Sequence, residues 1–95
     1  MIKHIVLYKL KNPDLDTEKT VDVLRSMVGR VPQIIELETG IDFLKSERSY
    51  DVALTVIVND ISELNLYQLD QYHCSVVKPF MHSVRSASVA IDYEI

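Results

Sequence analysis

Residues 50–59 read YDVALTVIVN, and this stretch decides the fold. Apolar side chains fill both alternating sets of positions: Tyr50, Val52, Leu54, Val56 and Val58 form one set, and Ala53, Thr55 and Ile57 form the other. A period of two with many β-branched residues predicts a strand from Tyr50 to Asn59. Because both sets are apolar, we expect other parts of the protein to cover both faces of this strand.

Upstream of this strand, the pattern predicts a strand, a helix and a second strand. Residues Ile2 to Lys11 alternate with an apolar middle, and Asn12-Pro13-Asp14 indicates a turn. We expect a helix from Asp16 or Thr17 to Val28, with Gly29 as its C-cap. Its predicted buried stripe is Val21, Leu24, Val28 and Val31. Residues Ile34 to Leu44 then form a strand with a bulge at Gly40.

Downstream, the pattern predicts one regular helix, one irregular helical piece and a last strand. Asp60 and Glu63 form a capping box that begins a helix ending near Leu69. A short helical piece is expected over Ser75 to His82, where Pro79 makes it irregular. Residues Arg85 to Ile95 alternate again and predict the final strand.

The element order β-α-β-β-α-β predicts one α+β domain over residues 1–95, a ferredoxin-like split βαβ sandwich. Two helices can cover only one face of its antiparallel sheet. The strands that are apolar on both faces would then leave a large apolar patch in water, which monomers rarely tolerate. We therefore expect a homodimer through the open sheet face, in other words a dimeric α/β barrel.

Composition and charge exclude several functional classes. The chain has 95 residues, 47% of them hydrophobic, and a net charge of −4 with scattered basic residues, which argues against nucleic-acid binding. No apolar run reaches the ~20 residues of a membrane span, and the N-terminal stretch lacks the pattern of a signal peptide. The single cysteine cannot form an internal disulfide. We expect a soluble, cytoplasmic protein without a membrane partner.

Tyr67 and His73 are the candidate catalytic pair. They are six residues apart, so they converge only if the helix ends near Leu69 to Gln71. A phenol and an imidazole at one cavity can share general acid–base work. The alternative is structural, with Tyr67 packed on the sheet and His73 bonded locally. His4 joins the candidate pocket if its face of the first strand is the helix-covered one.

Other titratable residues point to no further site. The spacing of His4, His73 and His82 fits no metal motif, and we expect neither a metal nor a cofactor. Cys74 is expected to be a small buried hydrophobe rather than a nucleophile. With two glycines in the chain there is no phosphate-binding loop. Three carboxylates are expected to form a solvated strand face: Glu36, Glu38 and Asp42.

The sequence resembles the stress-responsive α/β-barrel (Dabb) family along nearly its whole length. The resemblance is carried by the opening IKHIVLYKLK, the strand YDVALTV, the spacing of Tyr67 and His73, and the closing AIDYEI. It implies a dimeric ferredoxin-like barrel, and most of the family has no established activity. The family often reads Y-x-x-H-P-x-H, whereas Asp70 and Gln71 stand here in place of His and Pro, which implies a less rigid loop and a more acidic pocket.

One branch of this family, the plant polyketide cyclases such as olivetolic acid cyclase, uses a Tyr and a His at the spacing of Tyr67 and His73. A His at the position of His4 lies in its pocket. The resemblance thus implies a small, partly apolar ligand between sheet and helices, with cyclase- or lyase-like chemistry if the protein is an enzyme. Two alternatives stay open: a non-catalytic, stress-associated structural dimer, and a cofactor-free monooxygenase-like enzyme.

Overall fold

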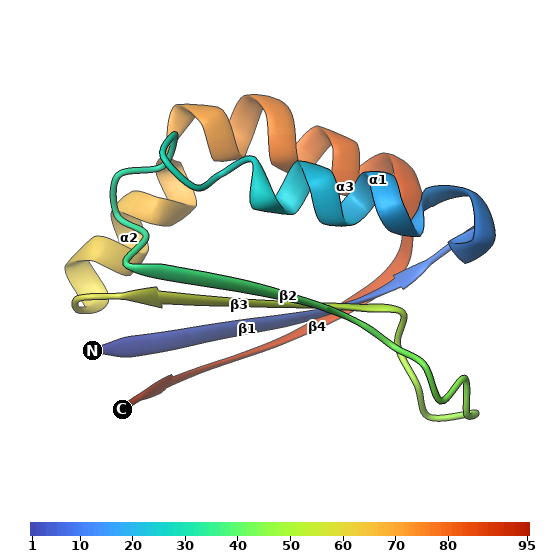
Figure 1. Cartoon of the computed structure of the whole chain (residues 1–95). Coiled ribbons are helices and arrows are strands. Elements are labelled where there is room, and N and C mark those ends of the chain that lie inside the picture. Colours follow the sequence, from blue (N-terminus) through green and yellow to red (C-terminus); the bar gives the residue numbers. More distant parts are fainter.

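The computed structural model describes all residues 1–95 as a sheet with helices on one side (Figure 1). Four antiparallel strands lie in the order β2-β3-β1-β4. Their bounds are β1 Ile2–Leu10, β2 Glu36–Ile41, β3 Val52–Val58 and β4 Arg85–Glu94. The helical segments are α1 Pro13–Arg25, α2 Ile61–Leu69, a π-helical turn His73–Val77 and α3 Lys78–Val84. This arrangement confirms the predicted ferredoxin-like α+β fold.

The two central strands carry the core on their helix-covered face. β1 pairs with β3 so that His4 lies opposite Val56 and Val6 lies opposite Leu54. The β3 residues on this face are at most 2% exposed: Val52, Leu54, Val56 and Val58. Complete burial of such side chains contributes about 1.5–3 kcal/mol each. The alternation that predicted β3 is therefore confirmed, although the strand is shorter than expected at both ends.

α1 begins earlier than its sequence signals predicted. Pro13 occupies the first helical turn, where its missing N–H costs nothing, and Asn12 is the N-cap. The turn expected at Asn12-Pro13-Asp14 is thus the helix start itself. The helix also ends earlier, at Arg25, so Val28 falls in a turn and is 59% exposed. The buried positions of this segment are Thr20, Leu24, Met27 and Val31.

Gly29 and Gly40 differ from their predicted roles. Gly29 has φ +81°, as a C-cap glycine would, but it lies three residues after the C-cap Ser26, in the turn that leads to Val31. Gly40 pairs with Ala53 in an unbroken register between β2 and β3, so the predicted bulge is wrong. β2 covers six residues rather than the eleven-residue stretch that the sequence indicated, because Ile34 and Ile35 belong to the preceding loop.

The second helical half contains a break and a π-helical turn. α2 begins with Asp60 as N-cap, whose side chain accepts a 2.8 Å hydrogen bond from the Glu63 N–H, and it ends at Leu69 as predicted. The chain then becomes extended at Asp70 and helical again from Gln71 to Val84. The irregular piece is longer than predicted, and Pro79 lies in the first turn of α3 directly after the π-helical turn.

The opposite face of the sheet has no cover within the chain (Figure 1). Strand register places apolar residues of β1, β3 and β4 together on it: Ile5, Leu7, Ala53, Ile57, Val89, Ile91 and Tyr93. Those on β4 are 42–58% exposed. A single chain therefore forms an open sheet rather than a closed barrel, and it leaves uncovered the face that the sequence predicted to be a dimer interface.

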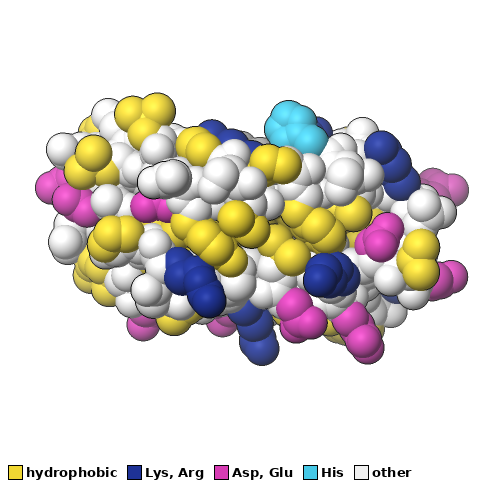
Figure 2. Space-filling model, turned by 90° about the horizontal axis from the view of Figure 1, so that it is seen from above, with side chains coloured by type: hydrophobic (Ala, Val, Ile, Leu, Met, Phe, Trp, Pro, Cys, Tyr) yellow, Lys and Arg dark blue, Asp and Glu magenta, His cyan; other side chains and the backbone are white.

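The helical layer also has an apolar surface. Seen from the helix side, hydrophobic side chains form a band along the middle of the layer with charged side chains on both flanks (Figure 2).

No helix combines the length and the hydrophobicity needed to cross a membrane.

Candidate functional site

A cavity of about 290 Å³ lies between the sheet and the second helical half. It brings together the three residues that the sequence singled out: His4 from β1, Tyr67 from α2 and His73 from the π-helical turn. Its size is near the lower limit of the range typical of ligand pockets. The other lining residues are Val6, Tyr8, Gln68, Val77, Lys78, Met81, His82, Arg85 and Ser88.

The break after Leu69 allows the convergence. In one continuous helix, positions 67 and 73 would face different directions. Because Asp70 is extended and the next helix begins at Gln71, the Tyr67 and His73 rings stack at a centroid distance of 4.5 Å. Asp70 also caps this second helix, since its Oδ1 accepts a 3.1 Å hydrogen bond from the His73 N–H.

His73 is buried and has a defined tautomer. Its Nδ1 lies 3.0 Å from the Tyr67 carbonyl oxygen, which can only accept, so Nδ1–H is the donor. In the neutral imidazole, Nε2 then carries the lone pair. Burial lowers the pKa of His73 below 6.5, and the Lys78 and His4 charges lower it further. The hydrogen bond to Tyr67 and the charge of Asp70 oppose them. His73 is therefore a neutral base at pH 7.

Tyr67 is fully buried, and its ring links the two histidines. The His4 ring meets the Tyr67 ring edge-on at a centroid distance of 5.6 Å, while the His73 ring stacks on it. Its hydroxyl donates to Met27 Sδ at 3.9 Å, a weak acceptor. Burial raises the pKa of Tyr67 above 10, and the charges of Tyr8, Asp70 and Asp92 raise it further. The phenol stays protonated at neutral pH and keeps its O–H as a hydrogen-bond donor.

His4 is held from the neighbouring strand. Its Nδ1 lies 2.5 Å from Asp92 Oδ1, and the register of β1 with β4 places the two residues directly opposite each other. The carboxylate accepts, so Nδ1–H of His4 is the donor and Nε2 is the remaining ring nitrogen. The sequence left open which face of β1 carries His4, and the structure places it on the helix-covered one. Asp92 was missed because its role depends on strand register.

Two other expectations about polar residues have different outcomes. Cys74 is exposed rather than buried, and its thiol lies 3.3 Å from the Gln68 carbonyl oxygen, so the predicted hydrophobic role is wrong. Adjacent residues on a helix point about 100° apart, so burial of His73 leaves Cys74 on the solvent side. Glu36 and Glu38 are exposed as expected, while Asp42 is half-buried and accepts a hydrogen bond from the Lys45 N–H.

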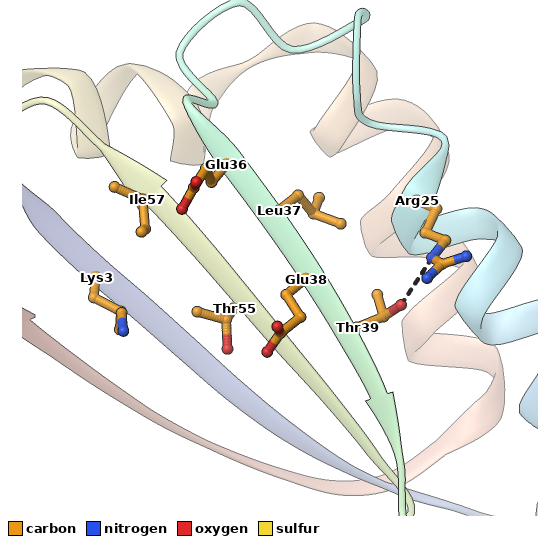
Figure 3. A pocket seen from close by; sticks show the side chains of 8 residues that line it. All are labelled: Lys3, Arg25, Glu36, Leu37, Glu38, Thr39, Thr55 and Ile57. Atoms are coloured by element: carbon orange, nitrogen blue, oxygen red, sulfur yellow. Dashed lines mark hydrogen bonds between the residues drawn. The ribbon is translucent and has the colours of Figure 1, made fainter.

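A second hollow, of about 380 Å³, lies along the edge strand β2 (Figure 3). Lys3, Glu38 and Thr55 extend from neighbouring strands into it, and Arg25 of α1 donates to Thr39 at 3.0 Å. The side chains of Glu36 and Glu38 make no recorded hydrogen bond or salt bridge. This hollow is mostly polar and open, and it contains no histidine or tyrosine to perform acid–base chemistry. No group of three or more His, Cys, Asp or Glu side chains is arranged to hold a metal ion.

Comparison with solved structures finds the same fold in proteins of low sequence identity. A dimeric ferredoxin-like protein of unknown function from Thermobifida fusca is 20% identical, with a TM-score of 0.83 over 99% of this chain and 90% of that chain. A Dabb family protein with a ferredoxin-like fold from Mesorhizobium loti is 16% identical, with a TM-score of 0.83 over 99% and 95%. An antibiotic biosynthesis monooxygenase is 12% identical, with a TM-score of 0.75 over 100% and 98%.

At these identities the structural likeness shows the fold alone. No curated protein matches the chain. The family model of the Stress responsive A/B Barrel Domain (Dabb) matches residues 2–95, a range that includes all four strands and every residue of the cavity. The chain therefore belongs to the stress responsive A/B barrel domain family.

Proposed function

We propose that the protein is a homodimer that binds a small, partly apolar molecule in the cavity between sheet and helices. The observation that carries this proposal is the convergence of His4, Tyr67 and His73 from three separate elements on one cavity of about 290 Å³. The wall also contains apolar side chains such as Val6, Val77 and Met81, which suit an apolar ligand body.

The geometry supports proton abstraction next to a carbonyl group. Nε2 of His73 would take the proton from the carbon, since its Nδ1–H is held by the Tyr67 carbonyl. The Tyr67 hydroxyl would donate to the developing enolate oxygen. To make this hydrogen bond, the Tyr67 hydroxyl would give up only its contact with Met27 Sδ, a weak acceptor. The pKa of the imidazole is lowered and that of the phenol is raised, which assigns base and acid to different residues. The resulting carbanion equivalent suits an aldol-type cyclisation or a lyase reaction.

Dimer formation through the open sheet face is the second part of the proposal. Ile91 and Val89 on β4 are about half exposed, and Ile5 and Leu7 lie beside them on β1. A second copy would cover this patch and leave the helix-covered cavity on each chain accessible. The structural neighbours described as dimeric support a dimer.

The test is small-molecule binding to the wild type and to His73→Ala. A set of aromatic acids, amides and amines is screened by ligand-observed NMR, with circular dichroism as the check on folding. Cys74→Ala is the matched control because Cys74 is the next residue along the chain and is exposed. We expect binding to wild type and Cys74→Ala and its loss in His73→Ala. Equal binding to all three folded proteins would remove His73 from the site.

A structural role is the second candidate, and the Tyr67 hydroxyl favours it. That hydroxyl is directed at Met27 in the core, and both His73 and His4 bond to groups of the same chain. Under this proposal the polar cluster only stabilises the packing of helices on the sheet. Failure of every compound in the screen to bind the wild type would favour it.

A further inference from the structure

The wall of the His73 cavity carries cations and no carboxylate. The cations on it are Lys78 and Arg85, His82 and the two buried histidines also line it, and neither Asp nor Glu is among the lining residues. This is unusual for a chain whose net charge is −4. Two acids lie just outside the lining: the Asp70 carboxylate accepts from the His73 N–H, and Asp92 is bonded to His4. The lining itself is cationic in an acidic protein, and a cleft lined by one sign of charge attracts ions of the opposite sign.

A strand irregularity places Arg85 on this wall. The register of β1 with β4 shifts between Lys9 and Leu10, so that Ser86 is the unpaired residue. Simple alternation would put Arg85 on the open face with Ala87. The bulge instead brings it to the cavity side with Ser88, in the way that bulges redirect side chains.

Lys78 is positioned from the helical side. Its Nζ donates a 3.0 Å hydrogen bond to the Gln68 carbonyl, which holds a half-buried side chain at the cavity. The structure contains one salt bridge, between His4 and Asp92, so neither Lys78 nor Arg85 is paired with an acid. Their charges act inside the cavity: Lys78 lowers the pKa of His73, and Arg85 opposes the effect of burial, which raises the pKa of Tyr8 to about 12.

We propose that the ligand of this cavity is a small organic carboxylate, with its carboxylate held by Arg85 and Lys78 and its apolar body against Val6, Val77 and Met81. This inference rests on the proposed function and names its ligand class. The guanidinium of Arg85 can bind both oxygens of one carboxylate, and the Lys78 ammonium can bind it as a point charge. The body of the ligand then lies beside His73 and Tyr67.

The experiment compares phenylacetate with phenylacetamide and phenethylamine, which present the same ring with an anionic, a neutral and a cationic group. Binding to ¹⁵N-labelled protein is followed by chemical shift changes at pH 7.5, with phenyl phosphate as a fourth probe. Arg85→Gln and Lys78→Gln remove one cation each. Arg48→Gln is the control because Arg48 is an exposed loop residue away from the cavity. Unchanged shifts outside the cavity verify folding of each variant.

We expect phenylacetate to bind at least about tenfold more tightly than the amide, with each cavity variant losing about tenfold, since one charge-assisted hydrogen bond contributes this much. Arg48→Gln keeps wild-type affinity, added salt weakens binding, and saturation with phenylacetate raises the pKa of His73. Equal affinity for phenylacetate and phenylacetamide at the cavity would overturn the inference that the ligand is a carboxylate, while the proposed small-molecule pocket would stand. Tighter binding of phenyl phosphate than of phenylacetate would overturn the carboxylate inference and indicate a phosphate ligand instead. Absence of binding by all four probes would overturn this inference and count against the proposed pocket as well.

Discussion

At the scale of the residue, His73 owes its properties to burial and to one backbone contact. Its side chain is almost completely buried, which disfavours the charged imidazolium. The Tyr67 carbonyl fixes Nδ1 as the protonated nitrogen. A base with a free Nε2 therefore exists before any ligand enters. Burial makes protonation of His73 unfavourable in the folded protein, against the opposing effect of the Tyr67 hydrogen bond, and this effect is measurable without knowledge of the ligand.

The stability of the protein is expected to fall as the pH decreases below 6.5, partly because of His73. Its pKa is near 6.5 in the unfolded chain and lower in the folded one, so the unfolded chain binds the proton first. Above 6.5 this contribution is constant. Urea unfolding from about pH 5 to about pH 8 should show a shallower acid decline for His73→Gln than for the wild type. Parallel pH profiles would contradict a buried neutral His73.

Tyr67→Phe is expected to change the free energy of unfolding at pH 7 by less than about 1 kcal/mol, because the lost hydrogen bond is to a thioether. At alkaline pH the two proteins should differ. The folded-state pKa of Tyr67 is raised above 10, so the unfolded chain ionises first and stability falls as the pH rises above 10. Thermal unfolding between about pH 9 and about pH 11 should show a weaker decline in Tyr67→Phe, with Tyr8 causing the remainder. An alkaline decline as steep in Tyr67→Phe as in the wild type would show that ionisation of Tyr67 does not cause it.

The sequence predicted which tyrosine and histidines the candidate site contains. It did not predict the direction of several other side chains around it. Tyr67 and His73 were identified because their convergence required one helix end, and α2 ends there. Asp92 and Arg85 could not be identified, since one depends on strand register and the other on a bulge. Cys74 was wrongly placed because the residue next to a buried His73 on a helix points away from the core.

At the scale of the element, the break at Asp70 decides whether a pocket exists. The chain is extended at this residue, and its carboxylate caps the helix that carries His73. The family often has His and Pro where this chain has Asp70 and Gln71. Here an acidic N-cap stabilises the start of the second helix, so the predicted loss of rigidity is offset by a hydrogen bond that the sequence comparison alone did not reveal.

Asp70→Ala is expected to destabilise the protein by about 1 kcal/mol and to disturb the His73 cavity. Asp60→Ala removes the equivalent cap of α2 and should cost about the same, while leaving the His73 environment intact. Chemical denaturation gives the two stabilities, and the NMR signal of the His73 ring reports the cavity. If both variants moved the His73 signal equally, Asp70 would have no special role in positioning it.

Gly29→Ala is expected to cost about 1 kcal/mol, because its φ of +81° is strained for an L side chain even though no atom lies within 4 Å of the added Cβ. Gly40→Ala should be nearly neutral, since its Cβ would make an ordinary 3.9 Å contact with the Ala53 Cβ. Urea unfolding of the two variants measures the contrast. A larger loss for Gly40→Ala would indicate that β2 is irregular after all.

Element types were easier to predict than element ends. The alternation of β3 and β4 and the cap at Asp60 gave strands and a helix start that the structure confirms. The start of α1 was misplaced because Asn12-Pro13 suits both a turn and the first turn of a helix, and only packing distinguishes them. Its end was misplaced because Val28 continues the apolar spacing after the helix has stopped.

At the scale of the whole molecule, the two faces of the sheet have different roles. The helix-covered face holds the core and the cavity, and the opposite face shows Ile91 and Val89 to water. β1 contributes side chains to both faces, since His4 lines the cavity and Ile5 lies on the open face. We therefore expect a second copy to cover the open face, which would stabilise β1 and β4 beneath the cavity.

Sedimentation velocity at micromolar concentration tests this expectation most directly. The account predicts a dimer for the wild type and for Leu15→Lys, a control at an exposed apolar position of α1, on the helix side of the molecule. It predicts at least about tenfold weaker dimerisation for Ile91→Lys, because a buried, unpaired ammonium is costly. A wild-type chain that sediments as a folded monomer throughout this range would contradict the account.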